Sequence, residues 1–214
     1  MDKPRVFECW IGKQRSGKTY ALKRRVAQLA SEKRICSVWI LDTTSEYRDL
    51  AGAVFVTSWA DYLERCRDSI PRVLVFGSNP VEWLKPADLI SEAAAQGDVC
   101  LVVDEAYLWM PQGTSIDPAW RLAILQGRHL PDVRGQLKPL HLVMAAQYPR
   151  SMHHLAWSQA NAIYVGQISG ERSREWVRGE FGQEAETRVD QLGEFEWIVL
   201  RGDRPKAEGI RWAK

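Results

Sequence analysis

The hydrophobic positions of the chain fall into short apolar runs, which alternate with longer segments in which apolar residues recur every three or four positions. Continuous apolar runs are typical of parallel strands that are buried on both faces, and the longer period is typical of helices that cover such a sheet. This pattern predicts strands at 5–11, 37–41, 73–76, 99–103, 140–145 and 162–166. It predicts helices at 18–30, 59–67, 86–96, 118–126, 173–181 and 183–192.

Two apolar segments near the C-terminus, at 196–200 and 209–212, flank a turn-rich stretch and predict a β-hairpin at the edge of the sheet. The alternation of strands and helices predicts an α/β fold with a mostly parallel central sheet flanked by helices. The chain has 214 residues and shows no repeat or linker, so residues 1–214 are expected to form a single domain.

The loop after the first predicted strand, Gly12-Lys13-Gln14-Arg15-Ser16-Gly17-Lys18-Thr19, fits the phosphate-loop pattern G-x-x-x-x-G-K-[ST]. It lies between a predicted strand and a predicted helix, which is the context that this motif requires. Backbone N–H groups of such a loop point at phosphate oxygens, and the helix N-terminus adds its positive end. We expect Lys18 to reach the β- and γ-phosphates of ATP and Thr19 to offer a hydroxyl to Mg²⁺. Tyr20, the next residue, completes the expected nucleotide-binding set.

The predicted strand 99–103 ends in two acids, Asp104 and Glu105. Buried parallel strands present functional groups at their carboxyl ends. Asp104 is expected to hold Mg²⁺ through water, and Glu105 to orient and deprotonate the water that attacks the γ-phosphate. Acids also end strands simply because they face solvent there, but the phosphate loop favours the catalytic interpretation. A water-activating glutamate favours hydrolysis over phosphate transfer to another acceptor.

Two polar residues elsewhere are weaker candidates. Gln147 follows the strand 140–145, where it either reaches the γ-phosphate and the attacking water or is a solvated strand end. Arg128 follows the helix 118–126. An arginine placed at the γ-phosphate of a neighbouring subunit stabilises the charge of the transition state, although a lone arginine after a helix is more often only solvated.

Composition limits the classes of binding partner and the cellular compartment that we expect for the protein. The 29 basic and 27 acidic residues give a net charge of +2, which excludes a strongly basic nucleic-acid coat but leaves a local DNA-contacting strip open. No apolar segment approaches the length of about 18 residues that a membrane helix needs, and no secretory signal begins the chain, so we expect a soluble intracellular protein. The cysteines show no zinc spacing, and Cys9, Cys36 and Cys100 are expected to be buried thiols.

In their order, the motifs resemble those of the HerA/FtsK superfamily of P-loop ATPases. Residues 12–19 resemble its Walker A motif, 41–47 its D-x-x-x-E-Y segment and 103–106 its Walker B motif. Gly127-Arg128, followed by an apolar strand and Gln147-Tyr148-Pro149, resembles a further block of the superfamily, and 192–195 with 202–205 resembles its closing hairpin. The resemblance spans nearly the whole chain.

This resemblance implies a RecA-like core of the additional-strand, catalytic-glutamate type, which assembles as a ring, usually a hexamer, and pumps double-stranded DNA through its centre with ATP. It implies that Gln147 is a sensor and that Arg128 acts in trans. The loop-like segment 130–138 stretches the distance from Arg128 to the next strand and contains Arg134, the alternate finger. Contacts to DNA phosphates are expected from Arg134, Lys138 and Arg150.

At this length, the resemblance is nearest to the genome-packaging ATPases of membrane-containing viruses and phages, which favours a translocase that packages viral double-stranded DNA into a capsid. The Zot-like ATPase for virion assembly and extrusion is the alternative, although its members normally carry a membrane helix. A small-molecule kinase is a third hypothesis. The packaging hypothesis places the protein in the host cytoplasm and at the virion vertex, with a capsid or virion membrane protein as a further partner.

Overall fold

The structure, a computed structural model, describes residues 5–66, 68–201 and 204–211. The chain divides into two compact units. Unit 1 contains the described residues of 1–6, 23–104 and 115–143, and unit 2 contains those of 7–22, 105–114 and 144–214. Helix α1 (Lys18–Ser31) and strand β8 (His141–Ala146) each contribute residues to both units.

Unit 1 contains a parallel sheet with the strand order β5-β2-β4-β3. Strands β2 (Ser37–Leu41), β4 (Val73–Phe76) and β5 (Val99–Val103) have the predicted bounds, and every residue in them is buried. Strand β3 (Ala53–Val56), at the edge, has no counterpart among the predicted strands, because a half-buried run of four residues is too short to distinguish from a loop. The continuous apolar pattern therefore identified the central strands and missed the edge.

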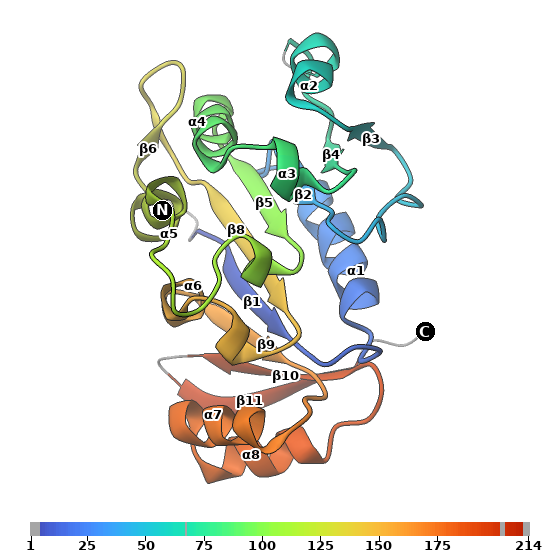
Figure 1. The fold of residues 1–214 in the computed structure, drawn as a ribbon, viewed down its shortest axis with the longest axis vertical. Coiled ribbons are helices and arrows are strands. Elements are labelled where there is room, and N and C mark those ends of the chain that lie inside the picture. The colour runs from blue at the N-terminus through green and yellow to red at the C-terminus, as the bar shows by residue number, and fades with distance from the viewer. Residues whose placement is uncertain (1–4, 67, 202–203, 212–214) are drawn as a thin grey trace. The chain divides into compact units, whose positions relative to one another are not determined.

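The helices of unit 1 begin at recognisable sequence signals. Helices α2 (Trp59–Arg65), α4 (Pro86–Gln96) and α5 (Pro118–Gln126) match the predictions within two residues. The side chains of Ser58 and Asp117 cap α2 and α5 by accepting backbone N–H groups of the first turn. Helix α4 packs against α5 and β5 (Figure 1), whereas the single turn α3 (Pro80–Trp83) was too short to predict.

The segment 130–138, loop-like in composition, forms a small hairpin between β6 (Leu130–Pro131) and β7 (Leu137–Lys138). One carboxylate organises its turn, because Asp132 Oδ1 accepts the backbone N–H groups of Arg134 and Gln136, both at 2.8 Å. This self-contained turn explains how a segment with proline and glycine is ordered as a hairpin.

Unit 2 contains β1 (Phe7–Ile11), which pairs in parallel with β9 (Ala162–Val165). Strand β10 (Glu196–Arg201) runs antiparallel to β9 and to β11 (Arg204–Arg211), which confirms the predicted C-terminal hairpin. Strand β11 begins five residues before the predicted bound, and residue 212 of the prediction lies outside the described residues.

The remaining elements of unit 2 surround these strands. Helices α7 (Glu171–Phe181) and α8 (Gln183–Asp190) pack against each other, and α8 lies against the β10–β11 hairpin (Figure 1). Three short elements were not predicted: η1 (Ala106–Leu108), η2 (Pro149–Ser151) and α6 (His154–Ser158). Trp10 of β1 stacks on Tyr164 with ring centroids 4.0 Å apart and meets Trp197 edge-on, so aromatic rings join β1, β9 and β10.

The structure shows which of the three cysteines predicted to be buried are in fact buried. Cys9 and Cys100 are buried, as predicted, whereas Cys36 is exposed because it lies one residue before the buried strand β2 begins. Within the part of the chain that the structure describes, no helix has the length and apolar character needed to span a bilayer.

Candidate nucleotide-binding and catalytic site

The phosphate loop joins β1 to α1 in unit 2. Its backbone takes the left-handed conformation at Arg15 (φ 64°) and Gly17 (φ 83°), and such residues turn successive N–H groups into an anion-binding concavity. Two hydrogen bonds anchor the start of the loop. The N–H of Gly12 donates to the carbonyl of Ala146 at 3.2 Å, and that of Lys13 donates to the carbonyl of Gln167 at 2.7 Å. The loop is therefore held next to the carboxyl ends of β8 and β9.

Both glycines of the motif are required by close packing. A Cβ atom on Gly12 would lie 2.6 Å from Ser16 Oγ, and one on Gly17 would lie 2.4 Å from the ring of Phe195. Phe195 also meets Tyr20 edge-on, with ring centroids 5.7 Å apart. Phe195 thus packs against the phosphate loop from the far end of the sequence. The motif itself carries no signal for this contact.

Three predicted catalytic residues meet beside this loop. Lys18 Nζ lies 3.0 Å from Glu105 Oε1, and Gln147 Nε2 donates to the same oxygen at 3.1 Å. The side chains of Lys18 and Glu105 are each only 8% exposed, so the ion pair is largely shielded from water. Glu105, two residues after the end of β5, has a left-handed backbone (φ 49°), a conformation that is uncommon for a residue with a side chain. The structure therefore brings together residues from three segments that are distant in the sequence.

The neighbouring acid, Asp104, is buried in unit 1, where it faces the hydroxyl of Tyr47. Burial, followed by the charges of Asp104 and Asp42, raises the pKa of Tyr47 well above its ordinary value, so its hydroxyl stays protonated beside the carboxylate. Asp42 accepts backbone N–H groups of Thr44, Glu46 and Tyr47 at 3.1 to 3.3 Å. The D-x-x-x-E-Y segment therefore folds its own loop through Asp42 and places Tyr47 near Asp104, a contact that sequence reasoning had not predicted.

The two candidate fingers belong to unit 1, and both are exposed. Arg128 follows the C-terminal end of α5, and Arg134 lies in the turn of the β6–β7 hairpin. Of the residues expected to contact DNA, Lys138 already has a partner, since its Nζ lies 3.0 Å from the carboxylate of Asp98. Arg150, in unit 2, is exposed in η2. The roles of these basic residues stay predictions.

The residues present fit a nucleotide with magnesium. The hydroxyl of Ser16 is buried inside the phosphate loop and has no hydrogen-bond partner among the described residues, which suits a phosphate oxygen. Thr19, in unit 2, carries a hydroxyl, and Asp104, in unit 1, carries a carboxylate, and both are oxygen ligands of the kind that Mg²⁺ prefers. No group of three or more His, Cys, Asp or Glu side chains in the described ranges is arranged to hold a metal ion. Magnesium in such sites is held by one or two protein oxygens together with substrate phosphates, so such a group is not required.

Comparison with known proteins identifies the fold. No model of a known protein family matches the sequence, and no curated protein matches it. The structure is similar to "B204, the DNA-packaging ATPase from Sulfolobus Turreted Icosahedral Virus", with a TM-score of 0.79 and 21% identity over 100% of both chains. This chain has the P-loop NTPase fold.

Two further structures share it. The genome packaging NTPase B204 from Sulfolobus turreted icosahedral virus 2, in complex with AMPPCP, has a TM-score of 0.76 and 22% identity over 97% of this chain and 98% of that one. VirB4 of Thermoanaerobacter pseudethanolicus has a TM-score of 0.61 and 11% identity over 97% of this chain and 89% of that one. The predicted RecA-like P-loop NTPase architecture, with its mostly parallel sheet, flanking helices and C-terminal hairpin, is confirmed.

Proposed function

We propose that the chain is an ATPase that moves double-stranded viral DNA into a capsid. The observation that carries the proposal is the meeting of Lys18, Glu105 and Gln147 beside a phosphate loop. The choice of packaging among P-loop activities is supported by likeness to the B204 packaging NTPases over 97% or more of this chain and 98% or more of theirs. All 214 residues would then serve as one motor domain.

ATP binding uses the loop and its lysine. The backbone N–H groups of residues 12–19, with the buried hydroxyl of Ser16, receive the phosphates, and Lys18 binds the β- and γ-phosphates. Thr19 and Asp104 are the residues that would hold Mg²⁺, which offsets the negative charge of the phosphates.

Hydrolysis requires the ion pair between Lys18 and Glu105 to open. When Lys18 turns to the phosphates, Glu105 Oε1 becomes available to a water molecule, while Gln147 still donates to that oxygen and holds the carboxylate in place. Glu105 then takes a proton from the water as its oxygen attacks the γ-phosphorus, and ADP leaves. ATP binding itself would therefore release the catalytic base.

The remaining steps involve other molecules. Arg128 of one chain would reach the γ-phosphate bound by the next chain in a ring, most simply a hexamer, with Arg134 as the alternate finger. Exposed basic side chains would contact DNA phosphates without reading the sequence. Such a motor would act in the host cytoplasm and at the virion vertex, where a capsid or virion membrane protein would anchor it.

Steady-state ATP hydrolysis with double-stranded DNA, with single-stranded DNA and without DNA tests the proposal. We expect double-stranded DNA to stimulate turnover. Glu105→Gln should keep ATP binding and lose turnover by about 10²–10⁴-fold, because the general base is removed while the loop is intact. Glu64→Gln, on the exposed surface of α2, is the matched control and should hydrolyse ATP normally.

Three outcomes would contradict the proposal. Turnover that no form of DNA stimulates would argue against a translocase. Stimulation by a coat or membrane protein alone would favour the Zot-like assembly ATPase. Transfer of phosphate to an acceptor other than water would favour the kinase.

A further inference from the structure

The segment before β1 in unit 1 carries a buried arginine that the proposed mechanism does not use. Arg5 is 7% exposed, and its guanidinium makes three hydrogen bonds to backbone carbonyl oxygens. Nε donates to Leu140 at 2.7 Å, Nη1 donates to Ile124 at 2.9 Å, and Nη2 donates to Ala123 at 2.5 Å. Buried arginines are rare unless they are paired in this way, and these three carbonyl oxygens belong to two segments of the chain.

These carbonyls lie on either side of the Gly127–Arg128 turn. Ala123 and Ile124 are in the last turn of α5, whose carbonyls lack partners within the helix, and Leu140 directly precedes β8. A cation there is also favoured by the negative end of the helix dipole. The planar fork of Arg5 therefore joins the end of α5 to the start of β8.

Gly127 fits this arrangement for a steric reason. A Cβ atom at position 127 would lie 2.6 Å from Arg5 Nη2 and 2.3 Å from the carbonyl oxygen of Ala123, although the backbone of Gly127 is ordinary for any residue (φ −58°). The N–H of Leu140 donates to the carbonyl of Gly127 at 2.7 Å, which closes the arrangement. The glycine of the Gly-Arg pair is thus explained by the guanidinium that packs against it.

Arg128, the residue after this glycine, is exposed and close enough to Arg5 to affect it electrostatically. Burial, followed by the charge of Arg128, lowers the pKa of Arg5 to about 10, and Arg5 therefore remains protonated at neutral pH. Repulsion between the two cations favours conformations in which Arg128 extends away from Arg5.

We propose that Arg5 is a positioning residue for Arg128: by clamping the end of α5 to the start of β8, it fixes the turn that presents Arg128 to a neighbouring chain. This inference rests on the proposed trans role of Arg128. A displacement of about 1 Å in a residue that contacts the reacting group costs on the order of 10²-fold in rate, so loss of the clamp would reduce turnover even if Arg128 itself were intact.

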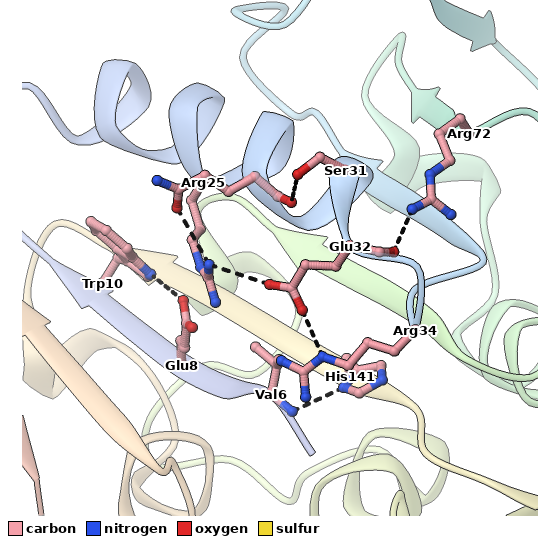
Figure 2. Close-up of polar contacts among 10 residues, drawn as sticks. Val6, Glu8, Trp10, Arg25, Ser31, Glu32, Arg34, Arg72 and His141 are labelled. Carbon is pink, nitrogen blue, oxygen red and sulfur yellow. Dashed lines mark hydrogen bonds and ion pairs between the residues drawn. The ribbon is translucent and has the colours of Figure 1, made fainter. Parts of the chain in front are cut away.

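The test compares Arg5→Met with Arg72→Met. Arg72 is the control because its guanidinium, although the residue is exposed, also donates to carbonyl oxygens at a helix end. The acceptors are Ala30 in the last turn of α1 and, after the helix, Glu32 (2.6 Å), Ile35 and Cys36 (2.9 Å). Figure 2 shows the bond to Glu32. Both substitutions should lower Tm by several degrees. Arg5→Met should lower kcat by about 10²-fold with little change in KM for ATP, whereas Arg72→Met should leave kcat unchanged. Arg5→Lys, which keeps the charge and some donors, should recover part of kcat.

Mixing variants separates positioning from a general loss of folding. A Lys18→Ala chain supplies Arg128 but no functional phosphate loop, so it should restore turnover when mixed with Arg5→Met, as it should with Arg128→Ala. Arg5→Met mixed with Arg128→Ala should stay inactive, since neither chain presents a finger. An unchanged kcat in Arg5→Met, or failure of the Lys18→Ala chain to rescue it while rescuing Arg128→Ala, would overturn the role of Arg5. Full turnover of Arg128→Ala would instead contradict the proposed trans finger.

Hydrogen exchange provides a readout that does not need activity. In Arg5→Met, the amides of His129 and Leu140, which donate to Gln126 and Gly127, should exchange faster than in the native chain. In Arg72→Met, the amide of Ile35, which donates to the carbonyl of Glu32, should exchange faster instead. Equal exchange at 129 and 140 in native and Arg5→Met chains would overturn the clamp even if no ATP were hydrolysed.

Discussion

The phosphate loop and the Gly127–Arg128 turn reach their geometry by different routes. In the loop, consecutive residues supply the turn, the left-handed positions at 15 and 17 and the lysine. In the turn, the geometry depends on Arg5, which bonds carbonyls 118 to 135 positions away along the chain. The phosphate loop therefore takes its shape mainly from its own residues, whereas the Gly127–Arg128 turn depends on a side chain that is distant in sequence.

The largest effect should follow from removing the lysine of the local motif. Lys18→Ala loses the charge that binds the β- and γ-phosphates, so turnover should fall by about 10³-fold and ATP binding should weaken. Lys23→Ala, five residues along α1, is the control and should be near normal, because Lys23 pairs with Asp49. Fluorescent-nucleotide titration and steady-state turnover measure the two quantities. Substantial turnover in Lys18→Ala would contradict the assignment of the loop.

The next largest effect tests whether the phosphate loop depends on a residue outside its motif. Gly17→Ala adds a methyl group 2.4 Å from the ring of Phe195 at a residue with φ 83°. The substitution should destabilise the fold by about 3 kcal/mol, from the backbone conformation and the overlap together. Combining it with Phe195→Ala should relieve the overlap but not the backbone strain. A double-mutant cycle by chemical denaturation measures the coupling, and strict additivity would show that Phe195 does not support the loop.

An effect of similar size, but confined to acid, concerns the start of β8 next to the Arg5 clamp. His141 Nδ1 accepts the N–H of Val6 at 2.9 Å (Figure 2). The pKa of His141 is lowered from 6.5 to about 4, mainly by burial. The nearby charges of Arg34 and Arg5 also lower this pKa, whereas those of Asp98 and Glu32 raise it. At a pH between these two pKa values, His141 is protonated in the unfolded chain but not in the folded one. The free energy of unfolding therefore falls as the pH falls. The loss should reach about 3 kcal/mol near pH 4.

Denaturation at pH 7, 5 and 4 measures this loss. His141→Gln keeps a hydrogen-bond acceptor but cannot titrate, so its stability should fall less steeply over the same range. If the stability of the native chain and that of His141→Gln fell equally with pH, other groups would account for the acid sensitivity.

The smallest effect should arise at the β6–β7 hairpin. Arg134→Ala should weaken DNA binding a few-fold and reduce its salt dependence by about one phosphate contact, because Arg134 is exposed in the turn. Lys138→Ala should change binding less, since its charge is paired with Asp98. DNA-binding isotherms at several salt concentrations measure both. A larger effect at Lys138 than at Arg134 would reverse the assignment.

Much of the fold could be predicted because its central strands are continuous apolar runs. Strands β2, β4 and β5 and helices α4 and α5 have the predicted bounds. The elements that were missed are short, like β3 and α6, or depend on one side chain, as the turn of the β6–β7 hairpin depends on Asp132. Short elements and a turn organised by one side chain leave little periodic signal in the sequence.

The candidate site shows the same division. Lys18, Glu105 and Gln147 could be predicted to converge, since each lies in a loop or strand end with a known place in parallel α/β folds. Arg5, Tyr47 and Phe195 could not, because each acts through contacts with segments distant in sequence. A buried arginine before the first strand and a tyrosine after an acidic turn have no local pattern that indicates their partners.

The central claim is that a phosphate loop in one chain is completed by an arginine from another. Turnover per chain, measured over a wide range of protein concentrations with and without double-stranded DNA, tests it most directly. The account predicts that turnover per chain rises with protein concentration and rises further with DNA, because both favour assembly. The opposite result would be a turnover per chain that stays constant down to concentrations at which the protein is monomeric. That result would contradict an arginine finger in trans.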